Sequence, residues 1–188
     1  MTRNARYLLA IVLGVIGVLG AIVLASPQAD ARDLPVTAFY GKFSGGGIAQ
    51  NADSEYFAMT TRDFDVVIKP AGSGVRIDWT SVIRRGGDPL NPKIRRRTSS
   101  KILRPTELPN VFHGTDSGNP LEGKELCWAR IDGNTLTVFL MTVSKKGVYE
   151  LQQYDRTLSG TGMTLLFRSW RDGDRLRSVS GRLVKTAN

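Results

Sequence analysis

Basic side chains are concentrated in one short stretch of this sequence, residues 84–104. Eight lysines and arginines lie there, and Asp88 is the only acid among them. Clustered charge raises the local electrostatic potential and attracts anionic partners. A charged strand edge that resists sheet-to-sheet pairing accounts for two or three such residues but less well for eight. The candidate surface for an anionic partner comprises Arg84, Arg85, Lys93, Arg95, Arg96, Arg97, Lys101 and Arg104.

Three aspartates form a second group that could do chemistry. Asp63 and Asp65 are two residues apart and therefore share one face of a strand, and Asp78 is expected on that face of the next strand. Three such carboxylates could hold a cation or share a proton. Nearby cations can equally neutralise them across strands, which favours a solvated outer face. These cations are Arg62, Lys69 and Arg76.

The chain has one histidine, His113, and one cysteine, Cys127. We favour a plain loop residue for His113, with a general-base role left open. Cys127 is expected to be buried, since free cysteine is among the most buried residue types; a reactive thiol is the lesser alternative. The sequence lacks the G-x-S-x-G and H-E-x-x-H signatures. We therefore predict no catalytic residue, no metal ligand and no cofactor.

β-strands must position these residues. From residue 125 to residue 186, apolar, β-branched and aromatic segments alternate with short turns that contain Asp-Gly, Lys-Gly or Gly-Thr-Gly. Turns this short join consecutive antiparallel strands, so the stretch predicts five strands in a meander. A meander must close on itself or cover its faces.

Two turns of this meander predict how its strands pair. A two-residue turn at Asp132-Gly133 would place Ala129 opposite Leu136. A three-residue loop at 172–174 would keep apolar residues of the last two strands opposite one another, whereas a two-residue loop would exchange the faces. The core face predicted for the first hairpin is Cys127, Ala129, Ile131, Leu136, Val138 and Leu140.

The strand predicted over 148–158 carries polar residues on both faces. One face holds Gln152, Tyr154, Arg156 and Leu158, and the other holds Leu151, Gln153 and Asp155. Buried polar side chains need partners or water, so the set that points inward would mark the floor of a pocket. The candidate ligand-binding residues are Gln152, Tyr154, Arg156 and Trp79.

Further strands are predicted before residue 125, over 38–43, 62–69, 75–83 and 93–104. Keeping apolar residues opposite one another places Val66 beside Trp79. Glycines at 45–47 permit the bend that barrel closure needs. The polar strand 93–104 is expected at an edge or facing solvent. Residues 105–123 are expected to form a long connecting loop.

These elements favour an all-β fold, an antiparallel up-and-down barrel of about 8–9 strands formed by residues 32–188. Before it, Leu8–Ala25 is an uncharged apolar run that follows Arg3 and Arg6. This run is either a secretory signal peptide cut before Arg32 or an uncleaved hydrophobic helix that anchors the chain in the inner membrane. Both alternatives predict an exported, periplasmic domain.

The expected barrel resembles the lipocalin or calycin-like barrels. Gly41-Lys42-Phe43 lies where lipocalins carry Gly-x-Trp on their first strand, with Phe in place of Trp and no cysteine pair. The chain is also similar in pattern to uncharacterised small exported barrels of Gram-negative bacteria. The resemblance implies a cup with an apolar or mixed interior that takes a small ligand, and it carries over no catalytic residue.

Three functions follow as hypotheses. The first is an exported cell-envelope barrel that binds a small apolar or amphipathic ligand. The second is an interaction protein that docks on anionic lipid or envelope polysaccharide through residues 84–104. The third is a cup-shaped enzyme that uses carboxylates. Nucleic acid is not expected as a partner, because no base-stacking aromatic residue lies among the arginines.

Overall fold

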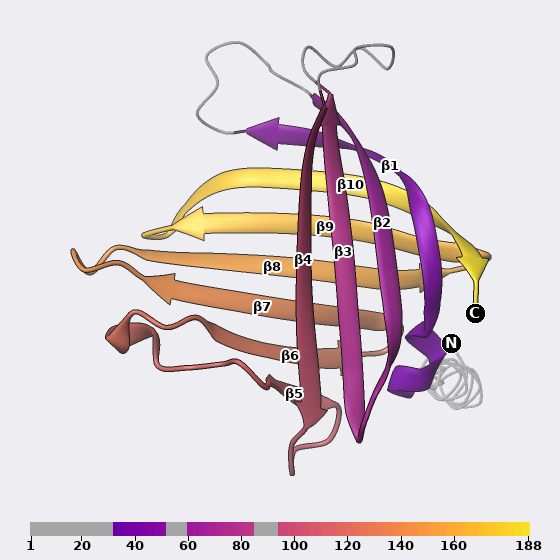
Figure 1. Ribbon diagram of the computed structural model, residues 1–188, viewed down its shortest axis with the longest axis horizontal. Coiled ribbons are helices and arrows are strands. Elements are labelled where there is room, and N and C mark those ends of the chain that lie inside the picture. Colours follow the sequence, from indigo (N-terminus) through magenta and orange to yellow (C-terminus); the bar gives the residue numbers. More distant parts are fainter. Residues whose placement is uncertain (1–31, 52–59, 85–93) are drawn as a thin grey trace, which may run out of the picture. The chain divides into compact units, whose positions relative to one another are not determined.

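Antiparallel strands joined in sequence order close into a barrel in the computed structural model, which describes residues 32–51, 60–84 and 94–188 (Figure 1). The described strands follow the ring order β1-β10-β9-β8-β7-β6-β5-β4-β3-β2. Their bounds are β1 Gly41–Asn51, β2 Thr60–Ala71, β3 Gly74–Arg84, β4 Ile94–Pro105, β5 Val111–Gly114, β6 Leu126–Asp132, β7 Thr135–Val143, β8 Tyr149–Ser159, β9 Gly162–Arg171 and β10 Asp174–Ala187. Two short 3₁₀ helices, Val36–Phe39 and Pro120–Glu122, complete the described elements.

The predicted all-β up-and-down barrel is confirmed, with ten strands in the described residues instead of about 8–9. The additional strand is β5, which lies within the loop predicted at 105–123. It pairs with β4 at Leu103–Pro105 and with β6 at Trp128–Arg130, and so completes the ring. Four residues are too few for an alternating pattern to show in the sequence.

Some predicted segments lie outside the described residues. These are the apolar run of residues 8–25 and the cations Arg85 and Lys93. Across the ranges that the structure does describe, no helix is both long enough and apolar enough to cross a membrane.

The first strand differs from the prediction over 38–43. A 3₁₀ helix ends at Phe39, and β1 begins at Gly41 and continues through the glycines. A Cβ on Gly45 would lie 2.0 Å from the carbonyl oxygen of Arg182, and one on Gly47 would lie 2.1 Å from that of Ser180. Glycine therefore lets β1 approach β10 closely while it curves from the direction of β2 towards that of β10 (Figure 1).

In both predicted hairpins the side chains lie on the predicted faces, but the turns differ from the prediction. Asp132 pairs with Thr135, so the β6–β7 turn is Gly133-Asn134 and Ala129 lies opposite Val138. A shift of two residues leaves every side chain on its predicted face, and the predicted core face is buried. The last hairpin has a two-residue turn where a three-residue loop was predicted. A bulge between Arg175 and Arg177 adds the one extra residue that keeps the predicted faces.

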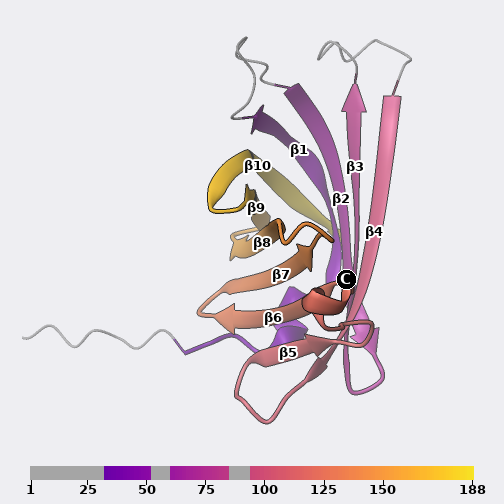
Figure 2. The ribbon, with the colours of Figure 1, turned by 90° about the vertical axis from the view of Figure 1, so that its left-hand side faces the viewer.

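The interior is packed most tightly at one end of the barrel. Strands β2–β4 run crosswise to β6–β9, and Figure 2 shows the upper parts of β3 and β4 standing away from β8 and β9, whereas β4 and β5 meet at the lower end. Fully or almost fully buried side chains at the packed end include Phe39, Phe43, Ile68, Val75, Ile77, Leu103, Cys127, Leu136 and Val138.

Candidate functional site

The inward face of several strands changes from apolar to polar along its length. On β3 the buried Val75 and Ile77 are followed by Trp79 and Ser81. The β4 face runs from the buried Leu103 to Ser99 and Arg97, and the β10 face runs from Leu183 to Val179 and Arg177. These changes occur at the same end of the barrel, because the antiparallel registers place the polar positions side by side. A pocket lies at that end.

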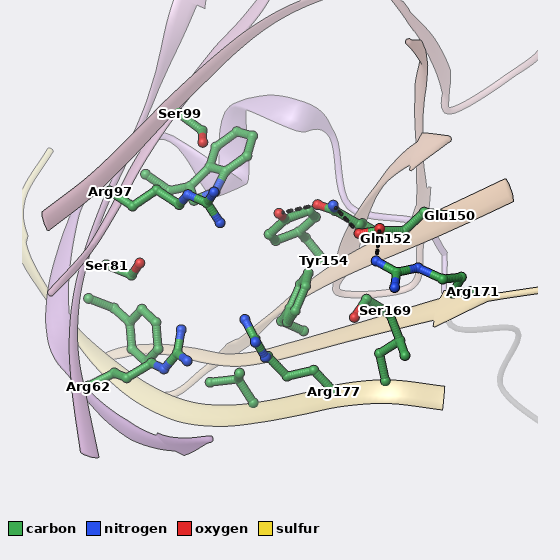
Figure 3. Close-up of a pocket in the computed structure, with 15 residues that line it drawn as sticks. Arg62, Ser81, Arg97, Ser99, Glu150, Gln152, Tyr154, Ser169, Arg171 and Arg177 are labelled. Carbon is green, nitrogen blue, oxygen red and sulfur yellow. Dashed lines mark hydrogen bonds and ion pairs between the residues drawn. The ribbon is translucent and has the colours of Figure 1, made fainter. Parts of the chain in front are cut away.

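The pocket has a volume of about 230 Å³ and lies between two groups of strands (Figure 3). Strands β2, β3 and β4 contribute Arg62, Phe64, Trp79, Ser81, Arg97 and Ser99. Strands β8, β9 and β10 contribute Glu150, Gln152, Tyr154, Phe167, Ser169, Arg171, Leu176, Arg177 and Val179. Aromatic rings and arginines thus face one another across the same space.

Arginines from separate strands converge on this pocket. Arg62 of β2, Arg97 of β4 and Arg177 of β10 extend towards it in Figure 3. Burial lowers the pKa of the Arg62 guanidinium, and repulsion from Arg177 and then Arg97 lowers it further. The Nε of Arg62 is buried without a hydrogen-bond partner. Mutual repulsion and an unused donor together make this side of the pocket suited to an anion.

The described lining of the pocket contains more basic than acidic side chains. Of the described residues that line the pocket, only Glu150 is acidic. Its carboxylate already pairs with Arg171, with 3.3 Å between Oε2 and Nη2. The lining therefore keeps an excess of positive charge, and the partly enclosed setting strengthens its attraction for an anion.

Hydrogen bonds along β8 fix the floor of the pocket. The Tyr154 hydroxyl donates to Oε1 of Gln152 at 2.8 Å, and Nε2 of Gln152 donates to Oε1 of Glu150 at 3.0 Å. Burial raises the pKa of Tyr154, so its hydroxyl stays protonated and can act as this donor. The Tyr154 ring packs against Trp79 and Phe167, with centroids 5.2 Å and 4.7 Å away.

A fifth arginine, Arg156, lies behind this floor. Arg156 does not line the pocket, and its side chain is fully buried. Its guanidinium carbon lies 5.2 Å from the centroid of the Trp79 ring and 5.6 Å from that of Tyr154. The two rings therefore separate the Arg156 charge from the pocket.

Of the four ligand-binding residues predicted from the sequence, Trp79, Gln152 and Tyr154 line the pocket and Arg156 lies beneath it. The other polar set of β8 points to the outer face. There Asp155 accepts hydrogen bonds from Thr137 at 2.9 Å and Arg168 at 2.5 Å. The structure thus decides between the two alternatives that the sequence left open.

The basic cluster at 84–104 is divided between two faces. The predicted β3–β4 hairpin forms. Arg95 and Arg97 share its inward face and Arg96 and Arg104 its outer face, and all four side chains are exposed. Lys101 lies on the inward face and pairs elsewhere, as described below; the side chain of Arg84 is outside the described part. The described cations of this cluster therefore do not all lie on one face.

Lys101 joins β4 to the segment that follows β5. Its ammonium lies 2.7 Å from the Asp116 carboxylate and 2.6 Å from that of Glu125. Burial alone would lower the Lys101 pKa, but the hydrogen bonds to these two acids raise it to about 12. Lys101 is therefore held in a structural ion pair and is not directed at the pocket.

The candidate aspartates lie on the outer wall, as the solvated alternative predicts. Asp78 pairs with Arg76 at 2.9 Å, and Asp65 accepts a hydrogen bond from Ser44 at 2.7 Å. Arg62, expected beside these acids, instead faces the pocket. Within the described ranges no three potential metal ligands lie together.

His113 and Cys127 lie in different environments. The His113 side chain is exposed on β5, opposite Trp128 on the outer wall, and it does not line the pocket. Cys127 is fully buried, as predicted, and burial raises the pKa of its thiol to about 11. A thiol in that state is a poor nucleophile.

Sequence reasoning missed three of the pocket arginines: Arg171, and the pair Arg62 and Arg177. The signal that could have found this pair is simple alternation. Arg62 has the parity of Phe64 and Val66, and Arg177 has that of Val179. Both positions therefore continue a core face beyond its last apolar residue.

No protein-family model matches this chain, and no curated protein matches it.

Solved structures share its fold. One is a protein of unknown function from the DUF3598 family of Nostoc punctiforme, with a TM-score of 0.55 and 12% sequence identity over 86% of this chain. The chain spans only about half of that protein, covering 53% of it. Another is the S-type phycobiliprotein lyase CPES from Guillardia theta, with a TM-score of 0.54 and 11% identity, covering 86% of this chain and 99% of that one. Both are consistent with the predicted lipocalin-like barrel.

Proposed function

We propose that this barrel binds a small amphipathic molecule that carries an acidic group. The observation that carries the proposal is the convergence of Arg62, Arg97 and Arg177 on a pocket whose described lining holds one acid, already paired. The acidic group of the ligand accepts hydrogen bonds from these guanidinium groups. Hydrogen bonds to charged partners contribute about 1.5–3 kcal/mol.

The apolar part of the ligand packs against the rings that line the pocket on both groups of strands. Phe64, Trp79, Tyr154 and Phe167 supply ring surfaces there, and Leu176 and Val179 supply aliphatic ones. A volume of about 230 Å³ is below the range of about 300–1,000 Å³ typical of sites for drug-sized ligands. The ligand is therefore small, or it inserts only one end.

The fold shared with a phycobiliprotein lyase and a DUF3598 protein supports a cup-shaped scaffold for such binding. Fold alone does not define a ligand, so the specificity comes from the arginines and rings of this chain.

A matched pair of ligands tests the proposal. Octanoate and 1-octanol share an eight-carbon tail and differ in charge, and calorimetric titration of the full chain compares their affinities. We expect octanoate to bind at least about 10-fold more tightly than 1-octanol. This difference in affinity should become smaller as the salt concentration increases. Equal affinities, or no binding of either compound, would reject the proposal. Native mass spectrometry of the purified chain then searches for a co-purified acid.

A second candidate function is attachment to an anionic lipid or polymer surface outside the cytoplasm. The exposed Arg96 and Arg104 on the outer face of β4 favour it, although the divided cluster leaves few cations for one flat contact. The enzyme alternative needs paired carboxylates in the cup, and the described lining supplies one.

A further inference from the structure

Arg156 is a buried cation whose donors are not satisfied. It extends from β8 on the inward face, opposite Leu136 of β7 and Leu165 of β9, and its side chain is fully buried. Nη1 makes one long hydrogen bond, 3.5 Å, to the carbonyl oxygen of Tyr154. Nε and Nη2 are buried without any hydrogen-bond partner.

The acids nearest along β8 are engaged elsewhere. Asp155 points to the opposite face, where it accepts hydrogen bonds from Thr137, Gln153 and Arg168. Glu150 pairs with Arg171 at the pocket. In the described part of the chain, no carboxylate lies within ion-pair distance of Arg156.

This charge cannot be removed by losing a proton. Burial lowers the Arg156 pKa only to about 10, which leaves the guanidinium protonated at neutral pH. The faces of Trp79 and Tyr154 offset part of the charge through cation–π contacts. A buried ion still needs an opposite charge and acceptors for its remaining donors.

We infer that a compact monovalent anion, a halide ion or a single carboxylate group, binds to Nε and Nη2 of Arg156 beneath the pocket floor. Trp79 and Tyr154 line the pocket and also cover this guanidinium, so the anion enters from the pocket past these rings. The site does not depend on the proposed amphipathic ligand, because a halide alone occupies it.

Bromide is the probe, because its anomalous scattering locates it in a crystal. Crystals of the wild-type chain grown or soaked in sodium bromide should show an anomalous peak within contact distance of Nε and Nη2 of Arg156. In solution, bromide should raise the melting temperature more than fluoride does at equal ionic strength, since fluoride holds its water too firmly to enter a dry site.

Substitution assigns the effect to this residue. Arg156→Met keeps most of the side-chain volume and removes the charge, so the bromide-dependent rise in melting temperature should disappear. Arg182→Met removes an exposed arginine from β10 and should leave the rise unchanged. If Arg156→Met does not fold, the anomalous map of the wild-type crystal still tests whether bromide binds at Arg156.

Competition identifies the source of the anion. If octanoate displaces bromide from Arg156, the site receives the carboxylate of the pocket ligand; if both bind together, the site holds a halide and the acid stays at Arg62, Arg97 and Arg177. Either result supports the site. No peak at Arg156, together with a melting temperature indifferent to bromide, would overturn it whether or not octanoate binds.

Discussion

The two ends of the barrel interior share strands such as β3 and β4 but hold opposite kinds of side chain. At the packed end, Phe43, Leu103 and Leu136 are almost completely buried among other apolar groups. At the open end, Arg62 and Arg97 from the same wall border a pocket. The packed end stabilises the barrel and needs no ligand, which allows the open end to hold repelling charges.

Two phenylalanines give the largest expected contrast between the ends. Phe43→Ala removes a ring that is 1% exposed and should lower the free energy of unfolding by about 3–5 kcal/mol. Phe167→Ala removes a ring that borders the pocket, so the loss should be roughly half as large or less, because solvent already reaches the site. Urea unfolding of the full chain measures both. Equal losses would mean that the open end is as well packed as the other.

Neighbouring arginines on β4 test the role of the open end. Arg97→Met should weaken octanoate binding about 10-fold, the effect of losing one charge-assisted interaction, and should leave octanol binding unchanged. Arg96→Met is the matched control, since Arg96 is exposed on the outer face. Calorimetric titration measures the four affinities. A similar loss in both variants would point to general charge attraction.

Lys101 lies on the inward face of β4 between the two ends, and its ion pairs should make stability depend on alkaline pH. Because its folded-state pKa of about 12 exceeds the unfolded value of about 10.4, its contribution is complete below pH of about 10 and disappears as pH rises through 12. The contribution should be about 1–2 kcal/mol, since the Asp116 partner is 59% exposed and screened.

The measurement compares unfolding free energies of wild type and Lys101→Met from neutral to alkaline pH. The difference should narrow as pH approaches 12. Lys124→Met serves as control, because Lys124 is 67% exposed and its pair with Glu122 is long, at 3.5 Å. A difference that stays constant with pH would show that Lys101 acts through packing of its side chain.

The smallest expected effect concerns the outer face. Arg96→Ser should reduce binding of the full chain to anionic vesicles about 5-fold, since each cation near such a surface contributes about 1 kcal/mol. Co-sedimentation with anionic and neutral vesicles measures it, and Arg97→Ser, on the inward face, is the control. An equal reduction by both substitutions would contradict the division of the basic cluster between two faces.

The sequence alone determined the strands and the faces of most of them. Because side chains alternate along a strand, the inward faces of β3, β6 and β7 follow directly from residues such as Val75, Cys127 and Leu136. The β6–β7 turn was misplaced without changing a face, since the register moved by two residues. The short strand β5 was not predicted, because four residues are too few to show a periodic pattern.

Only the tertiary structure decided the site. The strand β8 has polar residues on both faces, and its local pattern cannot choose between Arg156 and Asp155. The pairing of β8 with β7 and β9 determines which face is inward, because it places Arg156 between the core residues Leu136 and Leu165. The faces of β8 therefore depend on its two neighbouring strands, and the alternation within β8 alone does not encode them.

The same reason explains the arginine cluster. Alternation assigns Arg62, Arg97 and Arg177 to inward faces one at a time, but it does not place them together. They meet because β1 pairs with both β2 and β10, which closes the ring and brings the first and last strands side by side. Closure is a property of the whole chain, and the grouping of these arginines at one pocket follows from it.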